Sequence, residues 1–160
     1  MSSTMYPRDP ARPEMEEMET PQGSGRLPRT HGILASIRID GTGALRDLRQ
    51  AVLDTAAAAQ LTEQRVLDMA LAANEIATNA ILHGGGAASV QIWIDERGWH
   101  CDVIDDGPGL SDPTAGTRPP GVQEGGFGMW IARRLCDEFE IVPRQSGLHV
   151  RLVAHRGHAR

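Results

Sequence analysis

The segment from Thr62 to the three glycines at residues 84–86 constrains the fold of this chain more than any other part of it. Its apolar residues recur at helical spacing, Thr62 can cap the start, and Glu63 lies near the positive end of the helix dipole. The faces expected to meet a sheet carry Leu67, Ala70, Ala73, Ala77, Ala80 and Ile81. The sequence therefore predicts a long helix that packs on a sheet and ends at the glycines.

The same helix carries a polar stripe. Glu75, Asn79 and His83 stand at i, i+4 and i+8, so they share one face. A solvated helix face usually carries several Lys, Arg and Glu, whereas this stripe holds one carboxylate, one amide and one imidazole. A carboxylate and an amide at this spacing can share Mg²⁺ with phosphate oxygens. The alternative is an incidental polar face, and for His83 a structural hydrogen-bonding role is favoured over catalysis.

A second feature is the pattern D-x-G-x-G at residues 105–109. Asp105 stands where an apolar strand-like run ends, and Gly107 and Gly109 would let a ligand approach the backbone closely. A carboxylate only accepts hydrogen bonds, which suits an exocyclic amine such as that of adenine. The alternative is a tight turn between a strand and a loop, for which Asp-Gly-Pro-Gly is equally suitable.

The third feature is a glycine-rich turn, G-G-F-G-M-W at residues 125–130, directly before an amphipathic segment. Glycines ahead of a helix leave backbone N–H groups free to hold phosphate, assisted by the helix dipole. The turn is no Walker A loop, because Gly-Lys-Ser/Thr is missing. It is no dinucleotide fingerprint either, because a proline-rich loop and not a strand precedes it.

The remaining periodicity completes a β-α-α-β-β-loop-α-β-β order. Strands are expected at residues 32–40, 89–96, 98–105, 138–142 and 148–154, helices at 43–59, 62–83 and 128–137, and a loop at 110–124. Paired strands with a few helices favour an α+β fold, a two-layer α/β sandwich. We expect a mixed, mostly antiparallel sheet with its helices on one face.

Length and composition limit the alternatives. A chain of 160 residues favours one folded domain, expected at residues 31–155. Residues 1–30, rich in proline and glutamate, are expected to be a disordered tail or a short interaction motif, and 156–160 a C-terminal tail. A net charge of −5 gives no support to a direct nucleic-acid partner. No apolar run is long enough to span a membrane and no secretory signal is present, so a cytoplasmic location is expected.

Two cysteines, Cys101 and Cys136, stand far apart in the sequence and form no C-x-x-C motif. Both are expected to be small buried hydrophobic residues in a reducing compartment, not a disulfide or a metal pair. The tryptophans Trp93, Trp99 and Trp130 are expected in the core or on a face of the sheet.

In this order and at these separations, the three features carry a resemblance. N-E-x-x-x-N-A-x-x-H-G, then D-x-G-x-G, then G-x-G before a helix, resembles the ATP-binding domain of the GHKL superfamily, which includes gyrase and the histidine kinases. The likeness covers residues 31–155 and implies the Bergerat ATP-binding fold. Within the superfamily, a short form without a phosphoacceptor helix pair looks like the anti-sigma factor serine kinases of the RsbW type. Residues 112–152 are similar to actinobacterial regulators of this group.

The resemblance implies a role for each matching residue. Asn79 would coordinate Mg²⁺ between the phosphates, Glu75 would orient or deprotonate the attacking hydroxyl, and Asp105 would accept from the adenine amine. Residues 110–124 would form the ATP lid. The pocket wall and the phosphate turn would be formed by Gly107, Gly109, Gly126, Phe127, Gly128 and Met129. One position departs from the pattern, since Gly147 is followed by Leu148 where such domains commonly carry Thr or Ser near the adenine.

The function that the resemblance implies is a Mg-ATP-dependent protein-serine kinase that is also an anti-sigma factor. Its expected partners are a sigma factor and an anti-anti-sigma protein of the STAS fold, and such kinases are often homodimers. Two alternatives stay open: a module that binds ATP and a partner without phosphoryl transfer, and a detached catalytic domain of a histidine kinase.

Overall fold

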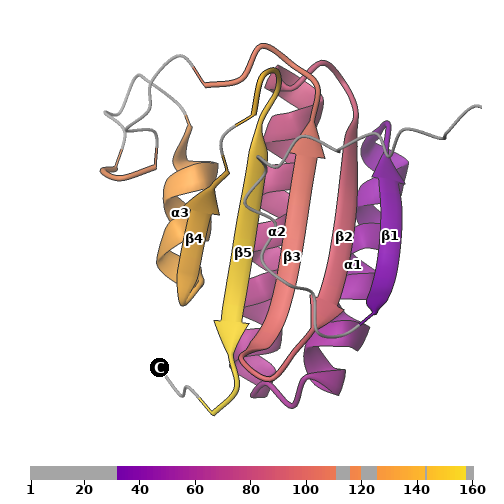
Figure 1. The fold of residues 1–160 in the computed structure, drawn as a ribbon, viewed down its shortest axis with the longest axis vertical. Helices are drawn as coiled ribbons and strands as arrows, with labels where there is room; N and C mark the ends of the chain where they lie inside the picture. The colour runs from indigo at the N-terminus through magenta and orange to yellow at the C-terminus, as the bar shows by residue number, and fades with distance from the viewer. Residues whose placement is uncertain (1–31, 111–115, 120–125, 143, 158–160) are drawn as a thin grey trace, which may run out of the picture.

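The computed structural model describes residues 32–110, 116–119, 126–142 and 144–157 (Figure 1). The predicted tail at residues 1–30 and much of the predicted lid at 110–124 lie outside this part. The predicted order of elements is confirmed. The elements are β1 (Ile33–Ile39), α1 (Thr42–Ala58), α2 (Glu63–His83), β2 (Ala88–Ile94), β3 (Gly98–Asp105), α3 (Phe127–Leu135), β4 (Glu138–Ile141) and β5 (His149–His155).

The five strands form one sheet in the order β1-β2-β3-β5-β4, and each neighbouring pair is antiparallel. The helices lie together on one face of this sheet, behind it in Figure 1. The predicted two-layer α/β sandwich is therefore confirmed, with a sheet that is antiparallel in every described pair. No helix in the described ranges has the length and apolar character needed to cross a membrane.

The core lies between the sheet and the helix layer. Ile92, Cys101 and Leu152 are paired across β2, β3 and β5, and all three are buried on the helix side. Alanine supplies much of the opposing surface of α2, which lets this helix lie close to the sheet. Cys101 and Cys136 are both buried free thiols, as predicted. The tryptophan prediction is confirmed for Trp93 and Trp99, which are buried on the sheet.

One prediction for α2 is wrong. Leu67 was expected against the sheet, but its side chain is 50% exposed, and Arg65 is buried instead with 1% exposed. The reason lies in the contacts of Arg65: its guanidinium donates to the backbone oxygen of Leu135 and to Asp137 Oδ2, the latter at 2.6 Å. A charged side chain turned inward in this way places Leu67, two residues on, toward solvent.

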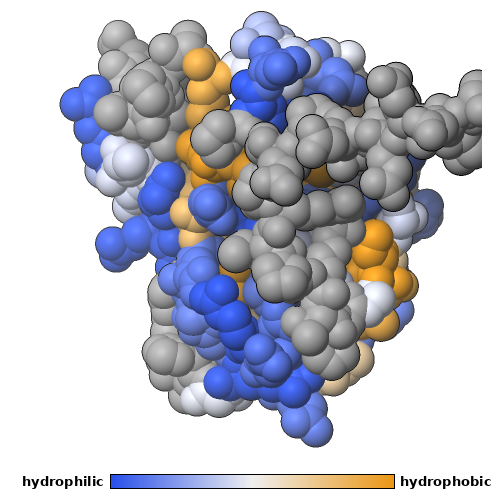
Figure 2. Space-filling view, viewed as in Figure 1, coloured by the Kyte–Doolittle hydropathy of each residue, from blue (hydrophilic) through white to orange (hydrophobic). Residues whose placement is uncertain are grey.

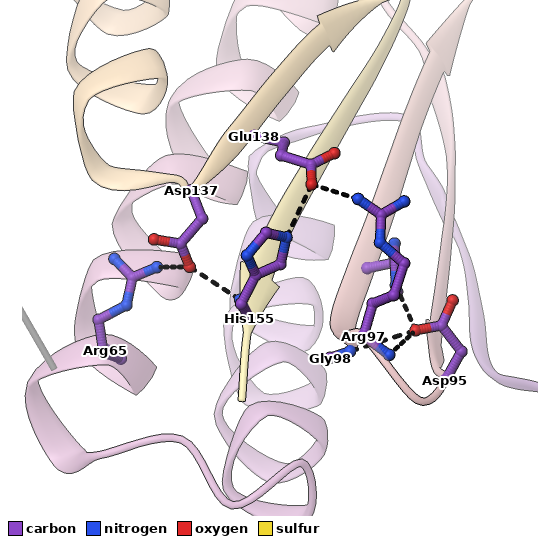
Figure 3. Close-up of polar contacts among 8 residues, drawn as sticks. Arg65, Asp95, Arg97, Gly98, Asp137, Glu138 and His155 are labelled. Carbon is purple, nitrogen blue, oxygen red and sulfur yellow. Dashed lines mark hydrogen bonds and ion pairs between the residues drawn. The ribbon is translucent and has the colours of Figure 1, made fainter. Parts of the chain in front are cut away.

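The pair of Arg65 and Asp137 joins the start of α2 to the end of α3 and to β5 (Figure 3). Asp137 Oδ2 also accepts from the backbone nitrogen of His155 at 2.8 Å. At the sheet surface nearby, Glu138 pairs with His155 and with Arg97, but these side chains are much more exposed. The ion pair of Arg65 and Asp137 is therefore buried and connects three elements, whereas the contacts of Glu138 lie at the surface.

We expect Asp137→Ala to lower the free energy of unfolding by about 3 kcal/mol, because it leaves the buried charge of Arg65 without its carboxylate. Arg97→Ala removes the surface pair and should cost less than about 1 kcal/mol. Urea unfolding followed by circular dichroism would measure both. Equal losses for the two variants would contradict the distinction.

The sheet face opposite the helices carries a compact polar cluster. Arg151 on β5 donates to both carboxylate oxygens of Asp102 on β3, at 2.8 and 2.9 Å. Nε2 of His149 lies 3.0 Å from Asp102 Oδ2. Trp93 completes the cluster, with the Arg151 guanidinium 5.3 Å above its ring. Burial by itself would raise the pKa of Asp102, but Arg151 and His149 hold that pKa below its ordinary value.

This lowered pKa predicts a loss of stability in acid. A carboxyl group whose pKa is lower in the folded state stabilises the fold above its unfolded pKa of 3.8 and loses this contribution as the pH falls through the folded value. Asp102→Asn should therefore be less stable than wild type at pH 7, and the difference should shrink below about pH 4. Urea unfolding at pH 7, 5, 4 and 3 tests this; a difference that stays constant from pH 5 to pH 3 would contradict it.

Candidate functional site

A pocket of about 600 Å³ opens where β3 ends, between the end of α2 and the start of α3. This volume lies in the range of small-molecule sites. Five of the residues predicted to bind ATP line it: Asn79, Asp105, Gly109, Gly126 and Met129. The other lining residues are mostly apolar or glycine: Leu82, His83, Gly84, Pro108, Leu110, Gly116 and Leu148.

Asp105 is held rigidly at the pocket wall. Its Oδ1 accepts from the backbone nitrogens of Gly107 at 2.9 Å and Leu148 at 3.1 Å. Its own nitrogen donates to the oxygen of Leu148 at 2.9 Å. Oδ2 receives no hydrogen bond from the residues that the structure describes, so it is the oxygen left for a ligand. Sequence reasoning missed the part of Leu148, because a backbone N–H leaves no mark on residue type.

Four glycines let the backbone segments around Asp105 approach one another. A Cβ on Gly84 would lie 2.5 Å from Asp105 Cγ, and one on Gly107 would lie 2.5 Å from the backbone of Gly84. Gly147 has φ +73°, and a Cβ there would lie 2.0 Å from the backbone oxygen of Asp105. A Cβ on Gly109 would lie 3.2 Å from the backbone oxygen of Gly147. Gly107 therefore lies outside the pocket lining and packs against Gly84, which lines the pocket. Gly84 was interpreted only as a helix stop, although it also makes room for the carboxylate.

The start of α3 faces the pocket, and its first backbone N–H groups have no partner within the helix. Its N-cap, Gly126, has φ +83° and ψ +21°, and no side chain in the described residues caps the helix there. The first N–H groups of a helix have no partner within it and carry the positive end of the helix dipole. Since Gly126 and Met129 both line the pocket, this end can receive an anion such as phosphate.

Glu75 lies one helical turn from Asn79, against the start of α3. A Cβ on Gly128 would lie 2.6 Å from Glu75 Oε2 and 3.4 Å from Asn79 Nδ2, so only glycine permits this contact. Glu75 is not among the residues that line the pocket. Phe127 does not line the pocket either; it is half exposed, and its ring lies edge-to-face on Trp130 at 6.4 Å. The structure therefore brings Glu75, Asn79 and Gly128 together and leaves Phe127 outside the pocket lining.

Of the predicted lid, only residues 110 and 116–119 are described, and Leu110 and Gly116 line the pocket. The rest of this prediction lies outside the described residues. In Figure 2 a hydrophobic patch is visible beside the upper end of α3 and β4, near the pocket.

The residues present fit a hard cation bound together with phosphate. Within the described ranges, no cluster of three or more His, Cys, Asp and Glu could hold a metal by itself. Mg²⁺ uses few protein oxygens and keeps water and phosphate as its other ligands. The amide of Asn79, on the pocket wall beside the uncapped start of α3, would supply such an oxygen.

We expect Gly84→Ala to weaken ATP binding by about tenfold or more, because its methyl group would force the end of α2 away from Asp105. Gly43→Ala, on α1, is the matched control, since nothing lies within 4 Å of its Cβ position. Titration calorimetry with ATP would measure both. Wild-type affinity in Gly84→Ala would contradict the role given to this close contact.

Comparison with known proteins agrees with this geometry. None of the curated protein sequences matches the chain. A solved structure with a similar fold is the SiaB–SiaC complex from Pseudomonas aeruginosa, with a TM-score of 0.56 and 15% identity over 75% of this chain and 89% of that chain. The model of the histidine kinase-like ATPase domain matches residues 41–154, which hold α1 to β5 nearly complete and every part of the pocket described above. This chain belongs to the family of histidine kinase-like ATPase domains.

Proposed function

We propose that this chain is a Mg-ATP-dependent protein-serine/threonine kinase that phosphorylates a STAS-fold partner and, with ATP bound, sequesters a sigma factor. The observation that carries the proposal is the position of Glu75. Its carboxylate packs against Gly128 at the start of α3, one turn from Asn79 and beside the end of the helix that can hold phosphate. A carboxylate at this place is suited to accept the proton of an attacking hydroxyl.

The proposed binding mode follows from the polar groups of the pocket. Asp105 Oδ2 accepts from the exocyclic amine of adenine, while the apolar side chains of Leu82, Leu110 and Leu148 enclose the base. The phosphates extend along the pocket to the N–H groups of α3. Asn79 would hold Mg²⁺, which would neutralise charge on the phosphate oxygens.

Transfer then needs a hydroxyl in line with the γ-phosphorus. The hydroxyl oxygen of the acceptor bonds to phosphorus as the bond to the bridging oxygen of ADP breaks, and the hydroxyl proton passes to Glu75. Such phosphoryl transfer depends mainly on positioning and on charge stabilisation. In this structure both would come from rigid elements, α2 and the start of α3.

The partners rest on the resemblance to anti-sigma factor kinases. The structural neighbour is a complex of two proteins, SiaB and SiaC, which is compatible with a chain that acts on a protein partner. A sigma factor acts in the cytoplasm, so the proposal places the chain there. A sequestering role would add a second surface for binding, beside the one used by the phosphorylated protein.

We expect Glu75→Gln to retain ATP binding but to lower phosphoryl transfer by about a hundredfold or more, since it keeps the shape of the side chain and removes the base. The measurement is transfer of label from [γ-³²P]ATP to STAS-fold proteins encoded nearby. Glu96→Gln, exposed in the turn between β2 and β3, is the control and should transfer as wild type.

Three other results of the transfer experiment would contradict the proposal or favour one of its alternatives. Wild-type transfer by Glu75→Gln would refute its role as the base. ATP-dependent binding of the partner without any transfer, also in wild type, would establish the module that binds without catalysis. An acid-labile phosphoryl product would establish transfer to histidine, because phosphoserine and phosphothreonine are stable in acid.

A further inference from the structure

Most of the exposed large hydrophobic side chains lie on or beside α2. Among the described residues, six of them are exposed: Ile33, Leu34, Leu67, Leu71, Leu82 and Phe127. The first two begin β1, and the other four lie on α2 or on the first residue of α3. Single exposed leucines are common and need no explanation, but grouped ones indicate an interaction surface.

Three of these residues form a line along α2. Leu67, Leu71 and Leu82 stand at i, i+4 and i+15, which places them within about 60° of one another around the helix. The opposite side of α2, with Met69, Ile76 and Ala80, is buried on the sheet. We call these three residues the leucine stripe. It covers about 22 Å of the outer surface of the helix layer.

The exposed charges that α2 itself carries beside the leucine stripe are acidic. The cation of α2 nearest to it, Arg65, is buried and paired with Asp137. Glu63, Asp68 and Glu75 are at least partly exposed on the same helix. A complementary partner would therefore present an apolar surface bordered by Lys or Arg. A second copy of this chain fits poorly, because two such stripes would bring acidic groups together.

The leucine stripe reaches the nucleotide pocket at Leu82, with Asn74 and Thr78 between Leu71 and Leu82 on that side of the helix. Leu82 lines the pocket, together with Asn79 three residues earlier. Leu71 precedes Glu75 by one turn, so it lies directly beside the proposed base. A protein seated on this stripe would thus contact the wall of the pocket and lie next to the carboxylate that receives the proton.

We propose that the leucine stripe is the docking surface for the protein that receives the phosphoryl group. This inference rests on the proposed kinase function and adds the surface and its chemistry. The acceptor lays an apolar face, flanked by basic residues, along α2, and this brings its hydroxyl to the phosphate end of the pocket. An amphipathic helix of the acceptor meets these requirements, since its apolar residues recur at the same spacing.

The test is the double variant Leu67→Gln/Leu71→Gln. Glutamine is a good helix former of similar length, and both side chains are exposed, so the fold should be kept. Calorimetry and label transfer are measured with the STAS-fold protein that wild type phosphorylates. We expect its affinity to fall by about tenfold or more, while ATP affinity and the melting temperature stay as in wild type. Leu34→Thr, equally exposed on β1, is the matched control and should bind the acceptor normally.

The failures can be told apart. If wild type phosphorylates a STAS-fold protein and the double variant binds it with unchanged affinity, the docking surface is wrong and the proposed function stands. If wild type transfers label to none of these proteins, the kinase proposal fails and the docking proposal fails with it. If Leu34→Thr weakens binding of the acceptor as much as the double variant does, the loss of affinity is not confined to changes on α2, and the proposal is overturned.

Discussion

The close contact between the end of α2 and the turn after β3 is the constraint on which the rest of the site depends. Gly84 and Gly107 meet backbone to backbone, without room for a Cβ on either. This contact sets the distance between Asn79, on the helix, and Asp105, at the end of the strand. A nucleotide that reaches from Asp105 to the start of α3 has to fit that distance, so a small displacement here would affect both ends of the ligand.

The far end of α2 is held by a different kind of interaction. Arg65 ties the start of the helix to Asp137 and to the backbone at the end of α3, so α2 and α3 are joined where they are remote from the pocket. At the pocket end, Gly128 of α3 packs against Glu75 and Asn79 of α2. Two helices fixed at both ends give the phosphate end of the site a stable geometry, even though α3 has only nine residues.

The elements that could be predicted from the sequence are those with a local signal. Thr62 and the glycines at 84–86 marked both ends of α2, and the short turns between neighbouring strand-like runs predicted the pairing of β2 with β3 and of β4 with β5. Asp105 and Asn79 were found because a carboxylate after a strand and an amide on an apolar helix are unusual there. In each case the pattern of a few neighbouring residues contained the information.

The remaining features depend on contacts between distant segments. Arg65 shares the buried face of α2 with Met69 and Ile76, but a charged residue type argues against burial, and the carboxylate that compensates it, Asp137, is 72 residues further on. Leu67 was placed on the wrong face because its side chain is apolar, although it lies opposite Met69 around the helix. The contribution of Leu148 to the site is a backbone hydrogen bond, and the space needed by Gly84 is set by a carboxylate 21 positions away in the sequence. None of these contacts follows from periodicity or residue type alone.

Leu148, the residue after Gly147, contributes to the site through its backbone nitrogen. Leucine at position 148 lacks the hydroxyl that such domains commonly place near the adenine. The backbone nitrogen of Leu148 nevertheless holds Asp105 Oδ1, and any residue at this position except proline could do the same. The carboxylate is therefore oriented without the hydroxyl, and Oδ1 is the oxygen that the backbone holds. In the proposed binding mode, leucine at this position would replace one polar contact to the base by apolar surface, and recognition of adenine would depend on Asp105 and on the fit of the base between leucine side chains.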